Sequence, residues 1–283
     1  IDRRPKFHLY KPNIALLSGI AWDHINVFPT FEGYVNQFRI FTDSLTDGGI
    51  MVYNEEDAIL KEVVESSSHS IKKYEYSTPA YQIEDGVTYI DTPDGLMPLE
   101  IFGDHNLQNL AGAKWVCQHM GIDEEDFYEA IASFKGASKR LEKIAESSET
   151  VIYKDFAHSP SKVKATTEAV KKQYAQRDVI ACLELHTYSS LNAAFLAEYN
   201  GALDKADKAV VFYSPHAVKI KQLDSVSEEQ ISNAFQRDDL IIFTNPAEFK
   251  EFLFSQNLHQ SAVVLMSSGN YGGLDFEEVK GLV

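Results

Sequence analysis

This 283-residue sequence has few cysteines and lacks long apolar runs, and each of these features excludes a class of protein. There are only two cysteines, Cys117 and Cys182, each within an apolar stretch. We therefore expect buried free thiols in a reducing compartment rather than a disulfide framework. No apolar run is long enough to cross a bilayer, and no signal peptide opens the chain. These absences predict a cytoplasmic protein with no membrane partner.

Basic residues are also few. The 26 Lys and Arg residues are outnumbered by 42 Asp and Glu residues, and the formal net charge at pH 7 is -16. Such a balance argues against general nucleic-acid binding, which depends on a basic face. An acidic protein that binds phosphates needs local Lys or Arg side chains, helix N-termini or a divalent metal at the site.

Familiar motifs of nucleotide and hydrolytic chemistry are missing from the sequence as well. It contains no Walker A phosphate loop (G-x-x-x-x-G-K-[ST]), no G-x-S-x-G nucleophile elbow and no Cys/His spacing typical of zinc. The first residue is Ile1 rather than Met, and it leads directly into a strand pattern. We therefore expect this chain to be cut from a longer polypeptide.

The first half of the chain alternates apolar runs with helical repeats. Strands are predicted at 13–20, 50–53 and 71–76, and helices at 31–45, 55–65, 106–120 and 123–134. Between residues 81 and 102 the pattern changes to strict alternation with Asp-Gly turns, which predicts a β-meander. Small residues at 136–138 mark the best domain boundary, so we predict two domains, residues 1–137 and 138–283.

The second half alternates strands and helices regularly. Strands are predicted at 151–156, 179–185, 209–212, 240–243 and 262–266. Helices are predicted at 161–174, 190–204, 227–235, 246–256 and from Phe276. This order is typical of βαβ units and predicts a Rossmann-like α/β domain with a parallel sheet and right-handed crossovers.

A polar cluster stands at the start of the helix predicted from residue 106. Asp104 can cap this helix, and Asn106 and Asn109 lie three residues apart on one face. A helix N-terminus offers free N–H groups and the positive end of a dipole, which suits an anionic ligand. From the spacing alone, a plain capped helix with two exposed amides is equally compatible.

Three further polar clusters follow predicted strands or the domain boundary. Asp23-His24 can hold a divalent metal or a phosphate, or can simply cap the next helix. Arg140 can form a bidentate phosphate clamp, or can belong to a solvated turn. Asp155 can accept ribose hydroxyls at a strand end, with His158 beside it.

Two polar loops are predicted on the same carboxyl edge of the sheet as Asp155. One contains His186, and the other runs from 267 to 273 as Ser-Ser-Gly-Asn-Tyr-Gly-Gly. Its glycines allow the backbone to approach a ligand closely, although a strand-to-helix turn also favours glycine. The loop is not the dinucleotide fingerprint, because that motif follows the first strand and this loop follows the last.

Taken in order, these segments resemble one family, the Mur ligases of peptidoglycan synthesis. Residues 19–24 resemble its T-N-x-x-x-D-H segment, and residues 103–109 its G-x-H-N-x-x-N segment. Residues 139–142 resemble its R-R-x-[DE], and residues 155–160 its D-[DY]-[AG]-H-x-P. Ordered matches across nearly the whole chain are more specific than any single motif.

The resemblance implies part of a central ATP-binding domain, a mixed sheet with helices, followed by a Rossmann-like C-terminal ligase domain. It implies an ATP-dependent amide ligase that uses ATP and Mg²⁺: the muramoyl carboxylate is phosphorylated and an amine then attacks the acyl phosphate. The UDP-binding domain and the Walker A loop would lie upstream of Ile1. We therefore expect residues 1–283 alone to be inactive without the missing N-terminal part.

The resemblance also implies a role for each matching residue. His24 would lie on the metal or phosphate side, and Arg140 would reach the γ-phosphate. The residues expected to hold ATP are His105, Asn106, Asn109, Asp155 and His158. The residues expected to face the incoming peptide are His186, Ser268, Gly269 and Asn270. The sequence departs from the family pattern at Lys139, Lys154 and Ser159, which weakens individual roles but not the ordered set.

Within the family, residues 134–141, 155–158 and 265–273 are most similar to the murein peptide ligase branch, which joins L-alanyl-γ-D-glutamyl-meso-diaminopimelate to UDP-N-acetylmuramate in cell-wall recycling. The UDP-N-acetylmuramate–L-alanine ligase branch is the alternative. Phe38 replaces the carbamylated lysine of other Mur ligases, and both branches lack that lysine. A non-catalytic nucleotide- or peptide-binding module and a folylpolyglutamate synthase relative are further hypotheses.

Overall fold

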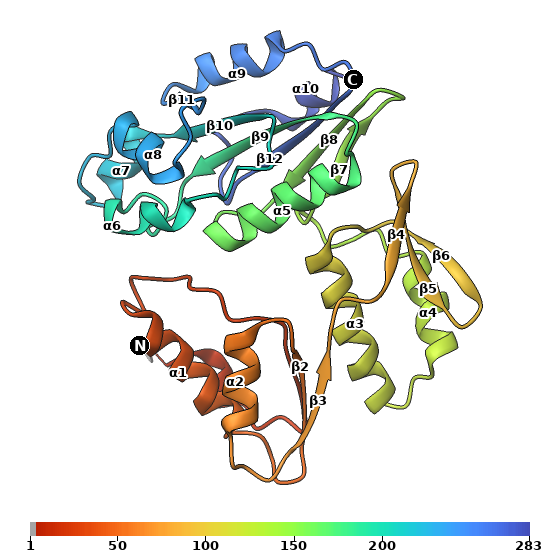
Figure 1. The fold of residues 1–283 in the computed structure, drawn as a ribbon. Coiled ribbons are helices and arrows are strands. Elements are labelled where there is room, and N and C mark those ends of the chain that lie inside the picture. Colours follow the sequence, from red (N-terminus) through yellow and green to blue (C-terminus); the bar gives the residue numbers. More distant parts are fainter. Residues whose placement is uncertain (1–3) are drawn as a thin grey trace. The chain divides into compact units, whose positions relative to one another are not determined.

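The computed structural model describes residues 4–283, and the chain forms two compact units, Ile1–Phe134 and Lys135–Val283 (Figure 1). The division falls close to the boundary that the sequence predicts after residue 137. Residues 1–3 of the predicted first domain lie outside the described residues. Within the described part, none of the helices has the length and apolar character needed to cross a membrane.

A parallel three-stranded sheet organises the first part of the N-terminal unit. Its strands are β1 (Ile14–Leu17), β2 (Ile50–Asn54) and β3 (Lys72–Tyr76), in the order β1-β2-β3, and the 3-10 helix η1 (Lys6–Leu9) precedes them. Strand side chains alternate between the two faces. Met51 and Tyr53 pack against α1 (Phe31–Thr42) and α2 (Ala58–Ser66), whereas Val52 packs under α3 (Asp104–His119).

The predicted β-meander is confirmed as a second, antiparallel sheet in this unit. It consists of β4 (Tyr81–Glu84), β5 (Val87–Thr92) and β6 (Gly95–Leu99). Asp85 and Gly86 both have positive φ, 50° and 76°, which is the turn chemistry that a two-residue hairpin loop requires. The sheet packs through Ile90 against Leu107 of α3 and Phe127 of α4 (Glu124–Ala132).

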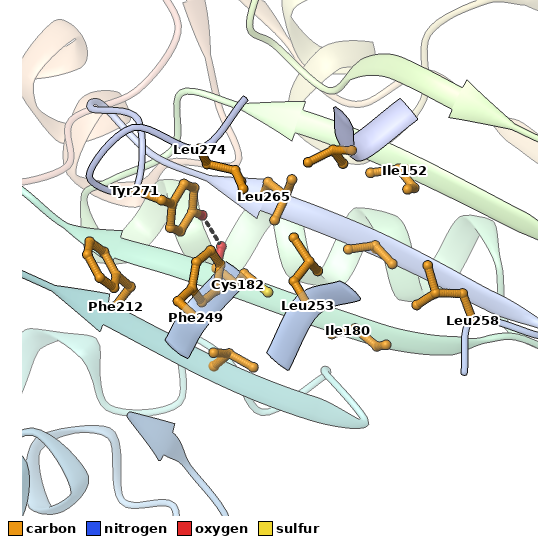
Figure 2. Packing of buried hydrophobic residues seen from close by; sticks show 13 residues of the cluster. Ile152, Ile180, Cys182, Phe212, Phe249, Leu253, Leu258, Leu265, Tyr271 and Leu274 are labelled. Carbon is orange, nitrogen blue, oxygen red and sulfur yellow. Dashed lines mark hydrogen bonds between the residues drawn. The ribbon is translucent and has the colours of Figure 1, made fainter. Parts of the chain in front are cut away.

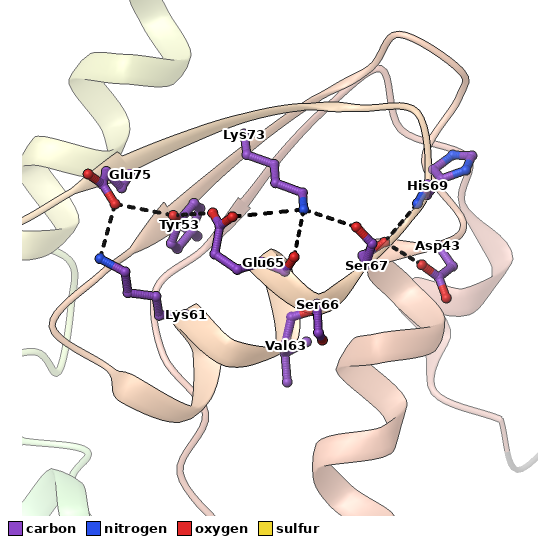
Figure 3. Close-up of polar contacts among 10 residues, drawn as sticks. All are labelled: Asp43, Tyr53, Lys61, Val63, Glu65, Ser66, Ser67, His69, Lys73 and Glu75. Atoms are coloured by element: carbon purple, nitrogen blue, oxygen red, sulfur yellow. Dashed lines mark hydrogen bonds and ion pairs between the residues drawn. The ribbon is translucent and has the colours of Figure 1, made fainter.

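A polar network ties α2 to β2 and β3 (Figure 3). The Tyr53 hydroxyl lies 2.6 Å from Glu65 Oε1 and 3.3 Å from Glu75 Oε2. The Lys73 ammonium donates to the carbonyls of Glu65, at 3.1 Å, and Ser67, at 3.0 Å. These carbonyls lie at the C-terminal end of α2, where backbone acceptors have no partner inside the helix, so Lys73 satisfies them.

The C-terminal unit is built on a six-stranded sheet in the order β11-β10-β9-β12-β8-β7. The parallel strands are β8 (Thr150–Asp155), β9 (Asp178–Leu185), β10 (Lys208–Tyr213), β11 (Ile241–Phe243) and β12 (Ser261–Met266). The edge strand β7 (Glu142–Glu146) is antiparallel to β8. The predicted parallel α/β sheet is therefore confirmed, with one antiparallel edge added.

Helices cover both faces of this sheet (Figure 1). On one face lie α5 (Pro160–Gln173), α6 (Ala193–Leu196), the 3-10 helix η2 (Ala197–Tyr199) and α8 (Glu228–Phe235). On the other face lie α9 (Pro246–Ser255) and α10 (Phe276–Lys280). The six-residue helix α7 (Pro215–Ile220) follows β10.

One apolar cluster of this unit lies between the sheet and α9 (Figure 2). Cys182 and Phe212 on the strands and Phe249 and Leu253 on α9 are buried there. Tyr271 stacks on Phe249, with ring centroids 4.8 Å apart and an interplanar angle of 9°. Because the central strands are buried on both faces, their sequences read as continuous apolar runs, which is why the sequence located them.

One predicted helix of this unit was too long, and two elements were not predicted. The helix predicted at 190–204 is only the short α6 and η2, because a turn at Thr187–Ser190 delays its start and Gly201, with φ 73°, follows its end. The sequence also missed α7 and β7. In β7 the segment Glu-Lys-Ile-Ala-Glu is charged, as is common in edge strands, so it lacks the apolar signature of a central strand.

Two buried tyrosines of the first unit allow a matched test of its packing. We expect Tyr53→Phe to lower the free energy of unfolding by about 2 kcal/mol, because it removes hydrogen bonds to charged carboxylates. We expect Tyr76→Phe to be neutral or to stabilise by up to about 1 kcal/mol. The Tyr76 hydroxyl is buried, and it has no hydrogen-bond partner among residues 4–283.

Urea denaturation at pH 7 measures both changes, and equal losses for the two variants would contradict this account. Burial, with Glu56 nearby, raises the pKa of Tyr76 to about 12. The unfolded chain loses this proton near pH 10, so the wild type loses stability as the pH rises from about 10 to about 12. Tyr76→Phe removes that contribution.

Candidate functional site

The carboxyl edge of the six-stranded sheet collects most of the residues that the sequence singled out. The adjacent strands β9, β12 and β8 end there. The chain leaves β8 and β9 toward α5 and α6 on one face, but it leaves β12 toward α10 on the other (Figure 1). In open α/β sheets, ligands bind at such a switch in direction.

Asp155, at the end of β8, is held entirely by neighbouring groups. It is only 4% exposed. Its Oδ2 accepts a hydrogen bond from Leu141 N, and its Oδ1 accepts one from Ala157 N, both at 2.6 Å. The Thr166 hydroxyl lies 3.4 Å from Oδ1. The carboxylate therefore fixes the turn before β7 and the loop after β8, whereas its contact with a ribose stays a prediction.

Arg140 is presented to solvent from the turn that Asp155 holds. Its two neighbours, Lys139 and Leu141, have positive φ values of 58° and 42°, a conformation that L-residues rarely adopt. The Lys139 carbonyl accepts a hydrogen bond from Phe156 N at 2.8 Å. The Arg140 guanidinium lies over the Phe156 ring, 5.3 Å from its centroid. The backbone is therefore preorganised, and the guanidinium fork faces outward.

His158 is fixed in one orientation next to this turn. Its side chain is buried, and Nδ1 lies 2.8 Å from the Phe156 carbonyl oxygen. Because a carbonyl only accepts, Nδ1 is the donor of this hydrogen bond. The His158 carbonyl accepts a hydrogen bond from the Tyr199 hydroxyl, which anchors the loop to η2. Both the ring and the loop are thus held in place.

Glu184 is a residue of this edge to which the sequence analysis assigned no role. It is the penultimate residue of the buried strand β9 and is 2% exposed. Its Oε2 accepts hydrogen bonds from the Ser267 hydroxyl and from Tyr271 N, the latter at 2.8 Å. Its Oε1 lies 3.5 Å from Nδ1 of His186. The signal in the sequence was a glutamate near the carboxyl end of an apolar run that a parallel sheet buries.

The loop after β12 is shaped by glycines and by Glu184. Tyr271, Gly272 and Gly273 have positive φ values of 52°, 71° and 110° in succession. A Cβ atom at Gly269 would lie 2.8 Å from Glu184 Oε2 and 3.0 Å from His186 Nδ1, so only glycine fits. The predicted residues His186, Ser268 and Gly269 are therefore brought together, with the exposed Asn270 next to them.

In the first unit, the predicted adenine residues lie in the first turns of α3. The prediction that Asp104 caps this helix was wrong: Gly103, with φ 89°, is the N-cap, and Asp104 instead accepts a hydrogen bond from the Tyr81 hydroxyl. Asn106 Nδ2 donates to the Phe102 carbonyl at 2.9 Å. His105 is half-buried and Asn109 is exposed. The Asn109 carboxamide matches the donor and acceptor pattern of an adenine edge.

His24 follows β1 in an exposed loop. Its side chain is 63% exposed, and its Nε2 lies 3.8 Å from Asp23 Oδ2. The loop is anchored at its start, because Ile20 N donates to Asp57 Oδ2 at 2.6 Å. Across residues 4–283, no group of three or more His, Cys, Asp or Glu side chains is placed to hold a metal ion. The Asp23–His24 pair alone does not form a Mg²⁺ site.

Two family models match this chain in the order of its two units. The Mur ligase middle domain matches residues 3–117, and the Mur ligase glutamate ligase domain matches residues 139–269. This chain belongs to the Mur ligase family. The resemblance in the sequence motifs is thereby confirmed at the level of the family, and the two-part α/β fold is the Mur ligase fold.

Relatives with curated names include the UDP-N-acetylmuramate–L-alanine ligase of Caldicellulosiruptor bescii, 27% identical over 80% of this chain. The chain spans about half of that relative, 51% of its length. A murein peptide ligase from Psychrobacter arcticus has the same fold, with a TM-score of 0.64 and 18% identity over 99% of this chain and 60% of its own.

A MurF ligase from Thermotoga maritima, solved in complex with ADP, aligns with a TM-score of 0.68. It is 16% identical, and the alignment covers 91% of this chain and 59% of that one. At identities of 18% and 16%, these two solved structures show only that this Mur ligase chain has the same fold. The branch of the family therefore has to be decided by substrate tests.

The role of Asp155 gives a direct test of this site. We expect Asp155→Asn to lower the free energy of unfolding of the C-terminal unit by about 1–3 kcal/mol. Both carboxylate oxygens face N–H donors, and a carboxamide replaces one acceptor by an NH₂ group that opposes a donor. Urea denaturation followed by far-UV circular dichroism measures the change.

The matched control is Asp275→Asn at the N-cap of α10. There a single oxygen accepts from Glu277 N, and Asn caps a helix as well as Asp, so we expect a change within about 0.5 kcal/mol. Equal effects of the two substitutions would contradict the view that Asp155 works through two acceptors.

Proposed function

We propose that this chain is the ATP- and amine-binding part of a Mur ligase that joins UDP-N-acetylmuramate to an amino group. One observation carries the proposal: Arg140, on a backbone fixed by Asp155, and the Glu184–His186 pair lie at the same carboxyl edge of one sheet. A cation for phosphate and a carboxylate–imidazole pair for an amine are the two recognition elements that such a ligase needs.

The residues fit a bound nucleotide in their chemistry. ATP supplies the phosphoryl group that activates the muramoyl carboxylate. Asn106 and Asn109 would recognise the adenine edge with their carboxamides, with His105 beside them, and His158 would contact the ribose or base. Arg140 would hold phosphate oxygens with two parallel N–H groups.

Asp155 would act on ATP mainly through Arg140, since its own oxygens already accept two short hydrogen bonds from the backbone. This refines the ribose role that the resemblance implies. No step is assigned to Mg²⁺, because Asp23 and His24 alone do not form its site.

For the amine we propose the murein tripeptide. The residues at 155–158 and 265–273 support this choice, as they resemble the murein peptide ligase branch. L-alanine is the second candidate, favoured by the curated relative at 27% identity. In both cases the activated group is the carboxylate of UDP-N-acetylmuramate.

A substrate comparison on the full-length polypeptide decides between the two amines. We expect kcat/KM for the tripeptide to exceed that for L-alanine by at least about tenfold, which corresponds to about 1.4 kcal/mol. Phosphate release with ATP and UDP-N-acetylmuramate is the measurement. A preference for L-alanine would overturn the tripeptide proposal. The absence of turnover with both amines would overturn the proposed ligase function.

The same assay on residues 1–283 alone should give no turnover above background. The sequence contains no Walker A loop, and so lacks the backbone cradle that such enzymes use for the phosphates. Turnover by this chain alone would contradict the proposal that an upstream part completes the site.

Arg140 is the residue through which the nucleotide proposal is tested. We expect Arg140→Lys to lower kcat/KM for ATP about tenfold, because lysine keeps the charge but loses the bidentate fork, and Arg140→Ala to lower it about a hundredfold. Lys205→Ala removes an exposed cation elsewhere and should change it less than twofold. Equal activity of Arg140→Ala and wild type would overturn the role of Arg140.

A further inference from the structure

The two oxygens of Glu184 face different partners. Oε2 accepts from both the Ser267 hydroxyl and Tyr271 N, and the Ser267 oxygen in turn accepts from Gly269 N at 2.7 Å. Oε1 faces His186 Nδ1 at 3.5 Å, at the outer limit of a hydrogen bond. The buried carboxylate is thus fixed by two donors on one oxygen, and its other oxygen is directed at an imidazole.

We propose that Glu184 is a positioning residue that holds His186 with its proton on Nδ1, and that Nε2 of His186 accepts a proton from the amino group of the incoming substrate. The inference rests on the proposed ligase function and adds the base for its second step. The burial of the two residues suits these roles, because the Glu184 side chain is 3% exposed whereas that of His186 is 41% exposed.

The proton transfer answers a requirement of amide formation. An amino group with a pKa near 8 or above is largely protonated at neutral pH and has no lone pair for attack. In the transfer, one N–H bond of the ammonium breaks, an Nε2–H bond forms on His186, and the electron pair stays on the amine nitrogen. The Glu184 carboxylate stabilises the resulting imidazolium, which then returns its proton to water.

Two neighbours of the ring agree with this assignment. Gly269 packs so closely that a Cβ atom there would lie 3.0 Å from both Cγ and Nδ1 of His186, so the backbone restricts the ring to the Glu184 side. The hydroxyl of Ser268, in the same loop, is buried without a hydrogen-bond partner in the described part of the chain.

Glu184→Gln tests the positioning role because its carboxamide can point only one way. Tyr271 N donates to the Oε2 position, so that position must stay an acceptor and takes the glutamine oxygen. The glutamine NH₂ group then faces His186 Nδ1 and forces it to become an acceptor, which moves the proton to Nε2. A nearly isosteric substitution therefore switches the tautomer.

Long-range ¹H–¹⁵N spectra of histidine-labelled residues 1–283 report the tautomer, with the signal assigned through His186→Gln. We expect the Nδ1–H form in the wild type and the Nε2–H form in Glu184→Gln. Ser267→Ala, which removes the two hydrogen bonds of the Ser267 hydroxyl but keeps the carboxylate, and the exposed Glu198→Gln should both keep the wild-type form. An Nε2–H form in the wild type, or no switch in Glu184→Gln, would overturn the positioning role.

Turnover by the full-length polypeptide tests whether His186 acts as the base. We expect Glu184→Gln to lower kcat with the amine substrate at least about a hundredfold, the usual contribution of a general base. Hydroxylamine, which is mostly unprotonated at neutral pH, needs no base, so its turnover should fall less than about twofold.

Each other outcome of this assay has its own meaning. Unchanged amine turnover, or an equal loss with hydroxylamine, would overturn the inference while leaving the ligase intact. Absence of turnover in the wild type would instead overturn the proposed function, and the inference with it.

Discussion

Carboxylates at or shortly after the carboxyl ends of strands accept backbone N–H groups and hold loops in both units. Asp57 accepts from Ile20 N after β1, Asp155 accepts from Leu141 N before β7, and Glu184 accepts from Tyr271 N after β12. An ionised carboxylate only accepts, and a loop that leaves a sheet presents N–H groups with no ladder partner. Charge-assisted hydrogen bonds of this kind are about twice as strong as neutral ones, so three side chains fix segments that have no regular structure.

This arrangement explains how exposed groups at the sheet edge are preorganised. Arg140 is exposed and the His186 side chain is 41% exposed, yet each is attached to a segment whose geometry a buried carboxylate determines. Positive φ values at Leu141 and Tyr271 are tolerated because these bonds compensate for their cost. The parallel sheet supplies the rigid base, since its central strands are buried on both faces.

The sequence predicted the parallel sheet of the second unit, the β-meander and the family, because continuous apolar runs, Asp-Gly turns and ordered motifs can be read from the sequence. It predicted a mixed sheet in the first unit, where the parallel strands β1–β3 and the antiparallel meander form two separate sheets. It could not locate β7, whose charged residues resemble a solvated turn, or the short α6, whose extent depends on the Thr187–Ser190 turn. It also assigned Asp155 to a ligand and gave Glu184 no role. Which donors a carboxylate accepts from depends on contacts distant in sequence, such as Glu184 with Tyr271, and spacing does not encode these.

The central claim is that strand-end carboxylates hold the loops of the candidate site, and amide hydrogen exchange tests it most directly. The account predicts that the Leu141 and Tyr271 amides exchange as slowly as amides within the neighbouring strands, although both lie in loops. It also predicts that the exchange of each amide accelerates when its carboxylate partner is replaced by a carboxamide. Exchange of both amides in the wild type at the rate of exposed loop amides would contradict the account.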